Sequence, residues 1–130
     1  MGHISQYVDS VELDNYGTAY GVMGNMDSDF KVVIEAHADE ISWRVNYIDS
    51  KGFIRVIRNG GSDTQIAPSM RVNVWGSKGP VSGVFGHPAI HIHDRAKDIT
   101  LDSIFVDVGA STKEEVIEMG INVGTVITFT

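Results

Sequence analysis

The chain has 130 residues, of which 42% are hydrophobic and 21% charged, and these proportions predict a soluble globular fold rather than a disordered chain. It contains no cysteine, so disulfides and thiolate zinc sites are excluded and any metal would be held by His, Asp or Glu. The formal net charge of -7 argues against a nucleic-acid partner, because such binding depends on Lys and Arg neutralising phosphates.

The sequence shows no feature that would direct it to a membrane. No apolar run approaches the ~18 residues that span a bilayer, and the N-terminus lacks the basic region and apolar core of a signal peptide. We therefore expect a cytoplasmic protein with no membrane partner.

In chain order, the first predicted element is a hairpin. Residues 11–13 and 18–22 have the composition of strands, and Asp14-Asn15-Tyr16-Gly17 between them suits a tight turn. After a polar loop, residues 31–36 (KVVIEA) form a near-continuous apolar run. Such a run is typical of a strand that is buried on both faces.

From Ile41 onward the hydrophobic pattern changes to alternation. Trp43, Val45 and Tyr47 fall on one face of a predicted strand, with polar residues between them. Turn residues at 49–52 lead into a strand at 53–57, which completes a second hairpin. Further strands are predicted at residues 71–75, 81–85, 103–108 and 125–129, with Gly79-Pro80 and His87-Pro88 as breaks.

One short helix is predicted after the strand at 103–108. Ser111 is a candidate N-cap, and Glu114 three residues later completes a capping box. Val116 and Ile117 supply the apolar side of the helix, and Gly120 ends it as the residue that follows the C-cap.

Many short strands with one helix predict a mainly β fold, as a small closed or partly open β-barrel, because closure removes exposed strand edges. Residues 31–36 do not fit this scheme, since a strand buried on both faces needs covering layers. One short helix cannot supply them. The mismatch is a first indication that part of the protein is missing from this chain.

The strongest chemical candidate is His37-Ala38-Asp39-Glu40, directly after the apolar run. In an extended chain His37 and Asp39 point to the same side. A carboxylate in that place can accept the second ring N–H of a metal-bound imidazole and fix its tautomer. The alternative is a solvated histidine at the polar end of a strand.

A second candidate group contains His87, His91, His93 and Asp94. His91 and His93 alternate as on one face of a strand, so a two-histidine metal site is conceivable. No third ligand is evident nearby. The alternative is a polar loop in which His91 hydrogen-bonds locally.

The other candidates have structural explanations. Glu114-Glu115 looks like a paired-carboxylate site, but the capping box accounts for Glu114 and the helix dipole favours Glu115 in the first turn. Asp107, in an apolar strand, is either a functional acid or an acceptor for backbone amides of the following loop. Four aromatic residues are interpreted as core or interface residues rather than a ligand cage: Trp43, Tyr47, Phe53 and Trp75.

An ordered series of motifs covers nearly the whole chain. The motifs are VIEAHADEI at 33–41, YIDSKGF at 47–53, GGSD at 60–63, IAP at 66–68, KGPVSGVFG at 78–86, PAIH at 88–91, VDVGAS at 106–111, KEE at 113–115 and GINVG at 120–124. In this order they resemble the dinuclear-metal glutamyl aminopeptidases, a family of dodecameric tetrahedral particles in which some members carry endoglucanase labels. Ser42 and Ser62 depart from the family pattern, which favours Gly and an aromatic residue there.

The resemblance implies that residues 1–40 are a fragment of a catalytic α/β zinc-peptidase domain and that residues 41–130 are its barrel-like lid or dimerisation domain. It implies that His37 is a metal ligand and that Asp39 is the acid of the catalytic site that orients this histidine. The remaining ligands and the catalytic Glu of such enzymes match no position in this chain. Glu114-Glu115 matches a helix of the lid domain instead.

Two functions of different class are therefore predicted. In the first, the chain is a segment of a metal-dependent aminopeptidase that would cleave N-terminal residues from peptides, and it is inactive by itself. The complete enzyme would use two divalent metal ions, zinc or cobalt, but one His cannot supply the three protein ligands of a catalytic zinc, so we expect none stably bound by this chain. In the second, it is a non-catalytic β-barrel dimerisation or interaction module. Both predict a homo-oligomer.

Overall fold

The structure is a computed structural model that describes residues 3–89, 91 and 98–130. The chain divides into two compact units, Met1–Ala38 and Asp39–Thr130, which are treated separately below. The helices of the described residues are all too short or too polar to cross a bilayer.

The N-terminal unit is a two-stranded hairpin with one short helical turn. The 3-10 helix η1 (Ile4–Gln6) precedes strands β1 (Ser10–Leu13) and β2 (Ala19–Val22), which pair in antiparallel register. Asp14 begins the turn and accepts hydrogen bonds from two backbone N–H groups of the same turn, each at 2.8 Å. Gly17 adopts a φ of 87°, a conformation that glycine tolerates best. The predicted hairpin is confirmed.

The predicted strand at residues 31–36 is wrong for this chain. These residues adopt no regular secondary structure, and Val32, Val33 and Ile34 are 70%, 88% and 91% exposed. A strand needs a neighbouring strand to pair with its backbone, and a strand buried on both faces needs two covering layers as well. No described residue supplies either one.

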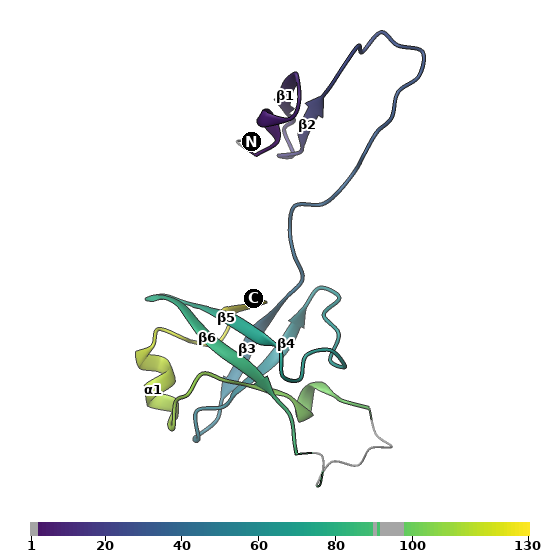
Figure 1. Cartoon of the computed structure of the whole chain (residues 1–130). Coiled ribbons are helices and arrows are strands. Elements are labelled where there is room, and N and C mark those ends of the chain that lie inside the picture. Colours follow the sequence, from purple (N-terminus) through teal and green to yellow (C-terminus); the bar gives the residue numbers. More distant parts are fainter. Residues whose placement is uncertain (1–2, 90, 92–97) are drawn as a thin grey trace. The chain divides into compact units, whose positions relative to one another are not determined.

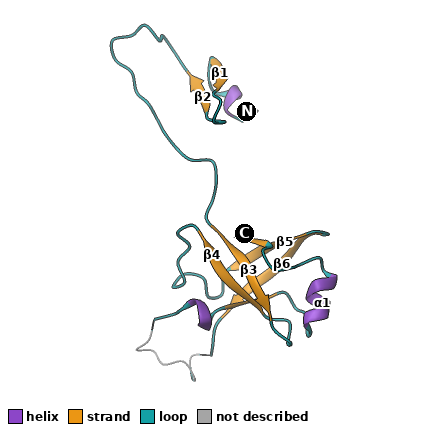
Figure 2. Ribbon diagram, turned by 180° about the vertical axis from the view of Figure 1, so that it is seen from behind, coloured by secondary structure: helices purple, strands orange, loops and turns teal. Residues whose placement is uncertain are grey.

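The unit Asp39–Thr130 is a closed barrel of six strands, arranged in the order β3-β4-β7-β6-β5-β8, and its neighbouring strands are all antiparallel. Figures 1 and 2 show the β3–β4 and β5–β6 hairpins crossing one another. The strands are β3 (Ser42–Ile48), β4 (Ile54–Asn59), β5 (Arg71–Gly76), β6 (Gly79–Gly86), β7 (Phe105–Asp107) and β8 (Val126–Phe129). The mainly β barrel with one short α-helix is thus confirmed, and it is closed.

The barrel interior is filled by apolar side chains from every strand. Trp43 is fully buried, and its ring lies edge-on against Phe85 at 5.1 Å between centroids. The prediction that Tyr47 shares a face with Trp43 and Val45 is wrong, because the register of β3 against β4 shifts between Val45 and Tyr47. A bulge adds one residue and reverses the alternation. Tyr47 is therefore 51% exposed, and Ile48 points inward instead.

Helix α1 (Lys113–Glu118) begins one residue later than predicted. Its N-cap is Thr112, whose side-chain oxygen accepts the N–H of Glu115 at 3.2 Å. The Glu115 carboxylate in turn accepts the N–H of Ser111 at 2.7 Å. The two carboxylates exchange the roles predicted for them, because the N-cap is Thr112, which has the extended backbone that an N-cap requires.

The end of helix α1 is fixed against the tip of the β5–β6 hairpin. Gly120, with a φ of 84°, follows the C-cap as predicted, and Ile121 donates its N–H to the carbonyl of Val116 at 3.3 Å. Val116 and Ile121 are both fully buried. Ser77 and Lys78 at the hairpin tip donate hydrogen bonds to carbonyls of Gly120 and Glu118. The hairpin itself turns before Gly79-Pro80, so this pair lies inside β6 rather than between strands.

Candidate functional site

The His37-x-Asp39 motif lies where the two compact units meet along the chain. The boundary falls between Ala38 and Asp39, so His37 belongs to the first unit and Asp39 to the second. Both side chains are exposed. The motif therefore does not follow a strand of the described residues, and its role remains a prediction.

The second histidine group is only partly described. His87 follows directly after β6 and is half-buried, and His91 is exposed. His93 and Asp94 lie outside the described residues. The two-histidine hypothesis therefore stays a prediction.

The described residues alone do not complete the metal centre that the family resemblance implies. Within residues 3–89, 91 and 98–130, no three His, Asp or Glu side chains gather closely enough to hold a metal ion. A catalytic zinc takes three protein ligands and a structural zinc takes four. The described part of the chain supplies one predicted ligand, His37, with Asp39 as its predicted orienting partner.

Two carboxylates that looked functional in the sequence have structural partners. Asp107 ends strand β7, and its Oδ1 accepts the N–H of Gly109 at 2.8 Å. This is the backbone-capping alternative predicted for Asp107. Glu115 caps helix α1, and Glu114 is an exposed first-turn residue. The structural interpretation of Glu114-Glu115 is thus supported.

The two departures from the family pattern, Ser42 and Ser62, contact one another. The Ser62 hydroxyl donates to the carbonyl oxygen of Ser42 at 2.9 Å, and the Asn59 amide donates to the Ser42 hydroxyl at 2.8 Å. Ser42 and Ser62 are both buried. Buried hydroxyls need partners, and each of these serines has one. Together they fasten the loop after β4 to the first residue of β3.

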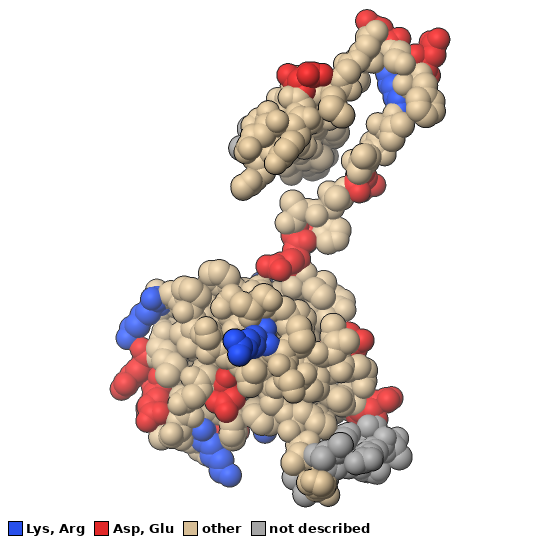
Figure 3. Space-filling view, in the orientation of Figure 1, with Lys and Arg blue, Asp and Glu red and all other residues tan. Residues whose placement is uncertain are grey.

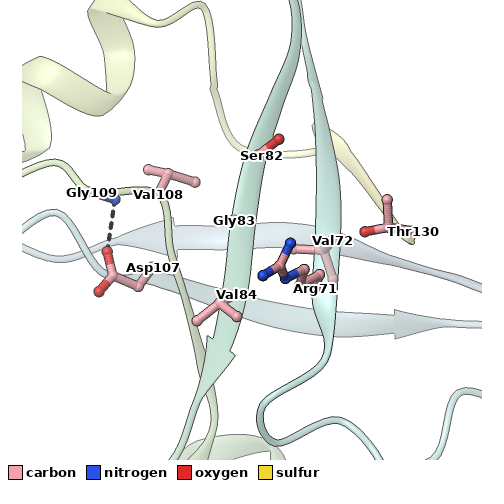
Figure 4. Close-up of a pocket in the computed structure, with 9 residues that line it drawn as sticks. All are labelled: Arg71, Val72, Ser82, Gly83, Val84, Asp107, Val108, Gly109 and Thr130. Carbon is pink, nitrogen blue, oxygen red and sulfur yellow. Dashed lines mark hydrogen bonds between the residues drawn. The ribbon is translucent and has the colours of Figure 1, made fainter.

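An open pocket of about 440 Å³ lies on the barrel over strands β5, β6 and β7. Figure 4 shows Val84 between the guanidinium of Arg71 and the carboxylate of Asp107. The strand register explains this row, because Arg71 pairs with Val84 and Val84 pairs with Asp107. The pocket is lined by Arg71, Val72, Ser82, Gly83, Val84, Asp107, Val108, Gly109 and Thr130.

The pocket exists because the β6–β7 ladder stops early. Its last pair is Val84 with Asp107, although β6 extends back to Gly79. Beyond Asp107 the chain turns away, held by the hydrogen bond from Gly109, which has a φ of 79°. Among the described residues, no strand therefore pairs with the backbone of Ser82 on the side of β6 that faces β7. Pro80, the next residue on that side, carries no backbone N–H.

The pocket lining does not form a catalytic arrangement. It contains the Ser82 hydroxyl but no histidine that could serve as a general base, and the Asp107 carboxylate already caps Gly109. The sequence did not single out Arg71 or Ser82. Each lies in an ordinary strand, and only the cross-strand register brings them near Asp107.

The charges on the barrel are dispersed. On the face drawn in Figure 3, isolated Lys and Arg side chains and small acidic groups are separated by uncharged surface. Among the ion pairs of the described side chains, Arg55 and Asp49 approach to 3.9 Å, and both are partly exposed. A pair of that kind contributes at most about 1 kcal/mol.

Residues 17–130 match the M42 glutamyl aminopeptidase family. A lysyl aminopeptidase of Pyrococcus furiosus is 36% identical over 127 residues, which cover 95% of this chain and 36% of that protein. The structure of a TET aminopeptidase from a marine sediment archaeon, Thaumarchaeota archaeon SCGC AB-539-E09, superposes with a TM-score of 0.76 at 27% identity, over 98% of this chain and 37% of that one.

A third similar protein is the TET1 peptidase of Pyrococcus horikoshii, which can assemble into a tetrahedron or a large octahedral shell. Its structure superposes with a TM-score of 0.68 at 26% identity, over 98% of this chain and 38% of that one. The chain thus spans between 36% and 38% of the length of these three proteins. The family match extends from the N-terminal hairpin through the H-x-D motif to the end of the barrel, and the chain therefore belongs to the M42 glutamyl aminopeptidase family.

Proposed function

We propose that this chain is a segment of a metal-dependent aminopeptidase that removes N-terminal residues from peptides. The observation that carries the proposal is the family match over residues 17–130, which includes both the H-x-D motif and the whole barrel. Residues 1–40 would belong to the catalytic domain, and residues 41–130 would form the lid or dimerisation domain. M42 aminopeptidases are metallopeptidases, so the complete enzyme needs its divalent ions.

Within that enzyme, the two residues of the motif have distinct tasks. His37 would donate an imidazole nitrogen to one metal ion. Asp39 would accept the other ring N–H, hold the tautomer and raise the basicity of the ligand, and loss of such a partner typically costs 10–100-fold in affinity or activity. We expect the 130-residue chain by itself to have no turnover, because one predicted ligand, His37, cannot hold a catalytic zinc that takes three protein ligands.

Self-association is the second part of the proposal. The TET1 peptidase of Pyrococcus horikoshii can assemble into a tetrahedron or a large octahedral shell, and its structure includes a region similar to nearly all of this chain. Trp75, Ile57 and Tyr47 are each between 43% and 51% exposed on the barrel exterior. Aromatic side chains of this kind are enriched at protein interfaces. We therefore expect the barrel to contribute to a homo-oligomer.

A chimera tests the catalytic proposal. The matching 127 residues of the Pyrococcus furiosus lysyl aminopeptidase are replaced by those of this chain, and hydrolysis of aminoacyl-nitroanilides is measured with zinc or cobalt present. We expect the chimera to retain activity, His37→Ala to abolish it and Asp39→Asn to lower it roughly 10–100-fold. Glu114→Gln, at an exposed first-turn position of helix α1, serves as the control and should leave activity unchanged.

The second candidate function is a non-catalytic interaction module, and the observation that bears on it is the exposed apolar surface of the barrel at Tyr47, Ile57 and Trp75. A chimera that remains active when His37 is replaced would favour this alternative. The isolated chain provides a further test in the same assay. Turnover by the 130-residue chain that His37→Ala abolishes would contradict the statement that the chain alone is inactive.

A further inference from the structure

Asn59, the last residue of strand β4, is the one asparagine of the sequence that a glycine follows. Asparagine in this context is chemically labile in a free peptide, because glycine has no side chain to keep its backbone nitrogen away from the asparagine amide carbon. Gly60 lies just beyond the β3–β4 ladder, whose last pair is Ser42 with Asn59, and it has a φ of 82°. The lifetime of Asn59 therefore depends on how its side chain is held.

The Asn59 side chain is held by the neighbouring strand. Its Nδ2 donates a hydrogen bond of 2.8 Å to the hydroxyl oxygen of Ser42, the residue directly opposite in β3. Ser42 is only 5% exposed, so water competes weakly for this bond. The bond draws the Asn59 amide toward β3 rather than along its own chain toward the nitrogen of Gly60.

Ser42 is fixed in turn by the loop that follows β4. The Ser62 hydroxyl donates to the Ser42 carbonyl oxygen at 2.9 Å, which leaves the Ser42 hydroxyl available to Asn59. All three residues lie in the compact unit Asp39–Thr130 and contact one another. The arrangement therefore does not depend on the N-terminal unit.

We propose that Asn59-Gly60 is a site of spontaneous deamidation, which the hydrogen bond to the Ser42 hydroxyl slows. In the reaction the Gly60 nitrogen attacks Cγ of Asn59, and a carbon–nitrogen bond forms as the bond from Cγ to Nδ2 breaks. Nδ2 leaves as ammonia with the proton that Gly60 loses. Water then opens the cyclic imide and leaves aspartate or isoaspartate at position 59.

The hydrogen bond opposes the first step of this reaction. Attack requires the two reacting atoms to approach to about 3–3.5 Å in an aligned geometry. The Asn59 amide reaches that geometry by rotating about its side-chain bonds, and this rotation breaks its bond to Ser42. The net strength of one such hydrogen bond corresponds to a roughly two- to ten-fold change in rate.

Deamidation would change the barrel where strand β3 begins. Isoaspartate carries the chain through its side-chain carboxyl, so it lengthens the backbone and displaces the residues that follow. Ser62 is bonded to Ser42 there, and Ile41 lies against Gly60, where an added Cβ would be 3.3 Å from the Ile41 Cγ2. The modified barrel should therefore lose the attachment of the loop after β4 to β3. This inference goes beyond the proposed function and does not depend on catalysis by any form of the chain.

Ageing the 130-residue chain at mildly alkaline pH tests the proposal, because the deprotonated backbone nitrogen is the attacking species. Released ammonia and peptide mapping for isoaspartate give the rate at Asn59. We expect Ser42→Ala to raise this rate roughly two- to ten-fold over that of the unsubstituted chain. Ser62→Ala is the matched control, since it removes a neighbouring hydroxyl but leaves the bond between Asn59 and Ser42, and it should leave the rate unchanged.

Two further measurements separate the hydrogen bond from the fold. A synthetic peptide of residues 57–62 gives the rate without a fold, and it should react faster than every folded variant. Tryptophan fluorescence shows whether each variant keeps the barrel, because both tryptophans lie in it. If Ser42→Ala unfolds the barrel, Ser42→Cys, kept reduced, takes its place, because a thiol is similar in size but a weak acceptor.

An unchanged rate in the folded Ser42 variant would overturn the proposal, and so would equal acceleration by Ser62→Ala. Modification of another asparagine in place of Asn59 would overturn it as well. A folded chain that reacts at Asn59 as fast as the peptide would show that the barrel gives no protection. Each of these outcomes is independent of aminopeptidase activity and of self-association, so this proposal and the proposed function can fail separately.

Discussion

The two units of this chain are both rich in strand-forming apolar residues, yet only one of them has a core. No described residue between 3 and 40 is buried, whereas Trp43, Val74 and Ile127 in the barrel are fully excluded from solvent. The difference lies in closure. Six strands that form a barrel enclose one face of every strand, while an isolated two-stranded hairpin has nothing to enclose. Apolar composition provides the driving force for burial, but tertiary arrangement decides whether burial occurs.

The sharpest contrast comes from the same substitution in both units. Ile127→Ala removes a fully buried side chain that lies between β3 and β5, and should cost about 2–5 kcal/mol in unfolding free energy. Ile34→Ala removes a side chain that is 91% exposed, and should change the unfolding free energy by no more than about 0.5 kcal/mol. Urea unfolding followed by tryptophan fluorescence measures the barrel, because both tryptophans, Trp43 and Trp75, lie in it. Equal effects would show that the barrel core does not dominate stability.

A pair of glycines gives a smaller contrast. Gly120 and Gly17 both have a φ near 85°, but only Gly120 is enclosed, since an added Cβ would lie 2.9 Å from the Lys78 backbone nitrogen. Gly120→Ala should lower barrel stability by about 2–4 kcal/mol, from left-handed backbone strain together with crowding. Gly17→Ala, with nothing within 4 Å of its Cβ, should leave the tryptophan-detected midpoint unchanged. A shift with Gly17→Ala would mean that the hairpin unfolds together with the barrel.

The smallest expected effect is the pH response of the hairpin. Hydrogen bonds from the Thr18 and Tyr16 N–H groups lower the pKa of Asp14 below its ordinary value of 3.8, and the Tyr20 hydroxyl contributes as well. The pKa of Asp14 is lower in the folded hairpin than in the unfolded chain. The stability that the Asp14 carboxylate gives to the hairpin is therefore complete above pH 3.8 and is lost as the pH falls through the lowered pKa. Amide NMR shifts of Tyr16 and Thr18 should follow that loss. Asp14→Asn should remove the pH dependence of these amide shifts. If the pH dependence persists in this variant, a group other than Asp14 causes it.

The sequence by itself determined the local elements and the family. The Asx turn at Asp14, the glycine after helix α1 and the alternation that begins β3 follow from residue chemistry over a few positions, and each is confirmed. The backbone-capping alternative for Asp107 is equally local, because its partner is two residues away. The ordered motifs pointed to the glutamyl aminopeptidase family, because the order of motifs along a chain can be read from the sequence alone, and the match over residues 17–130 confirms that family.

Only the tertiary structure decided the features that depend on contacts between distant segments. The bulge that turns Tyr47 outward arises from pairing with β4, and the pocket beside Asp107 arises where β6 and β7 part. The N-cap moved from Ser111 to Thr112 because the backbone conformation, not the capping pattern, selects the capping residue. For residues 31–36 the strand pattern was visible, but a strand exists only where another strand pairs with it, and within the described chain none does.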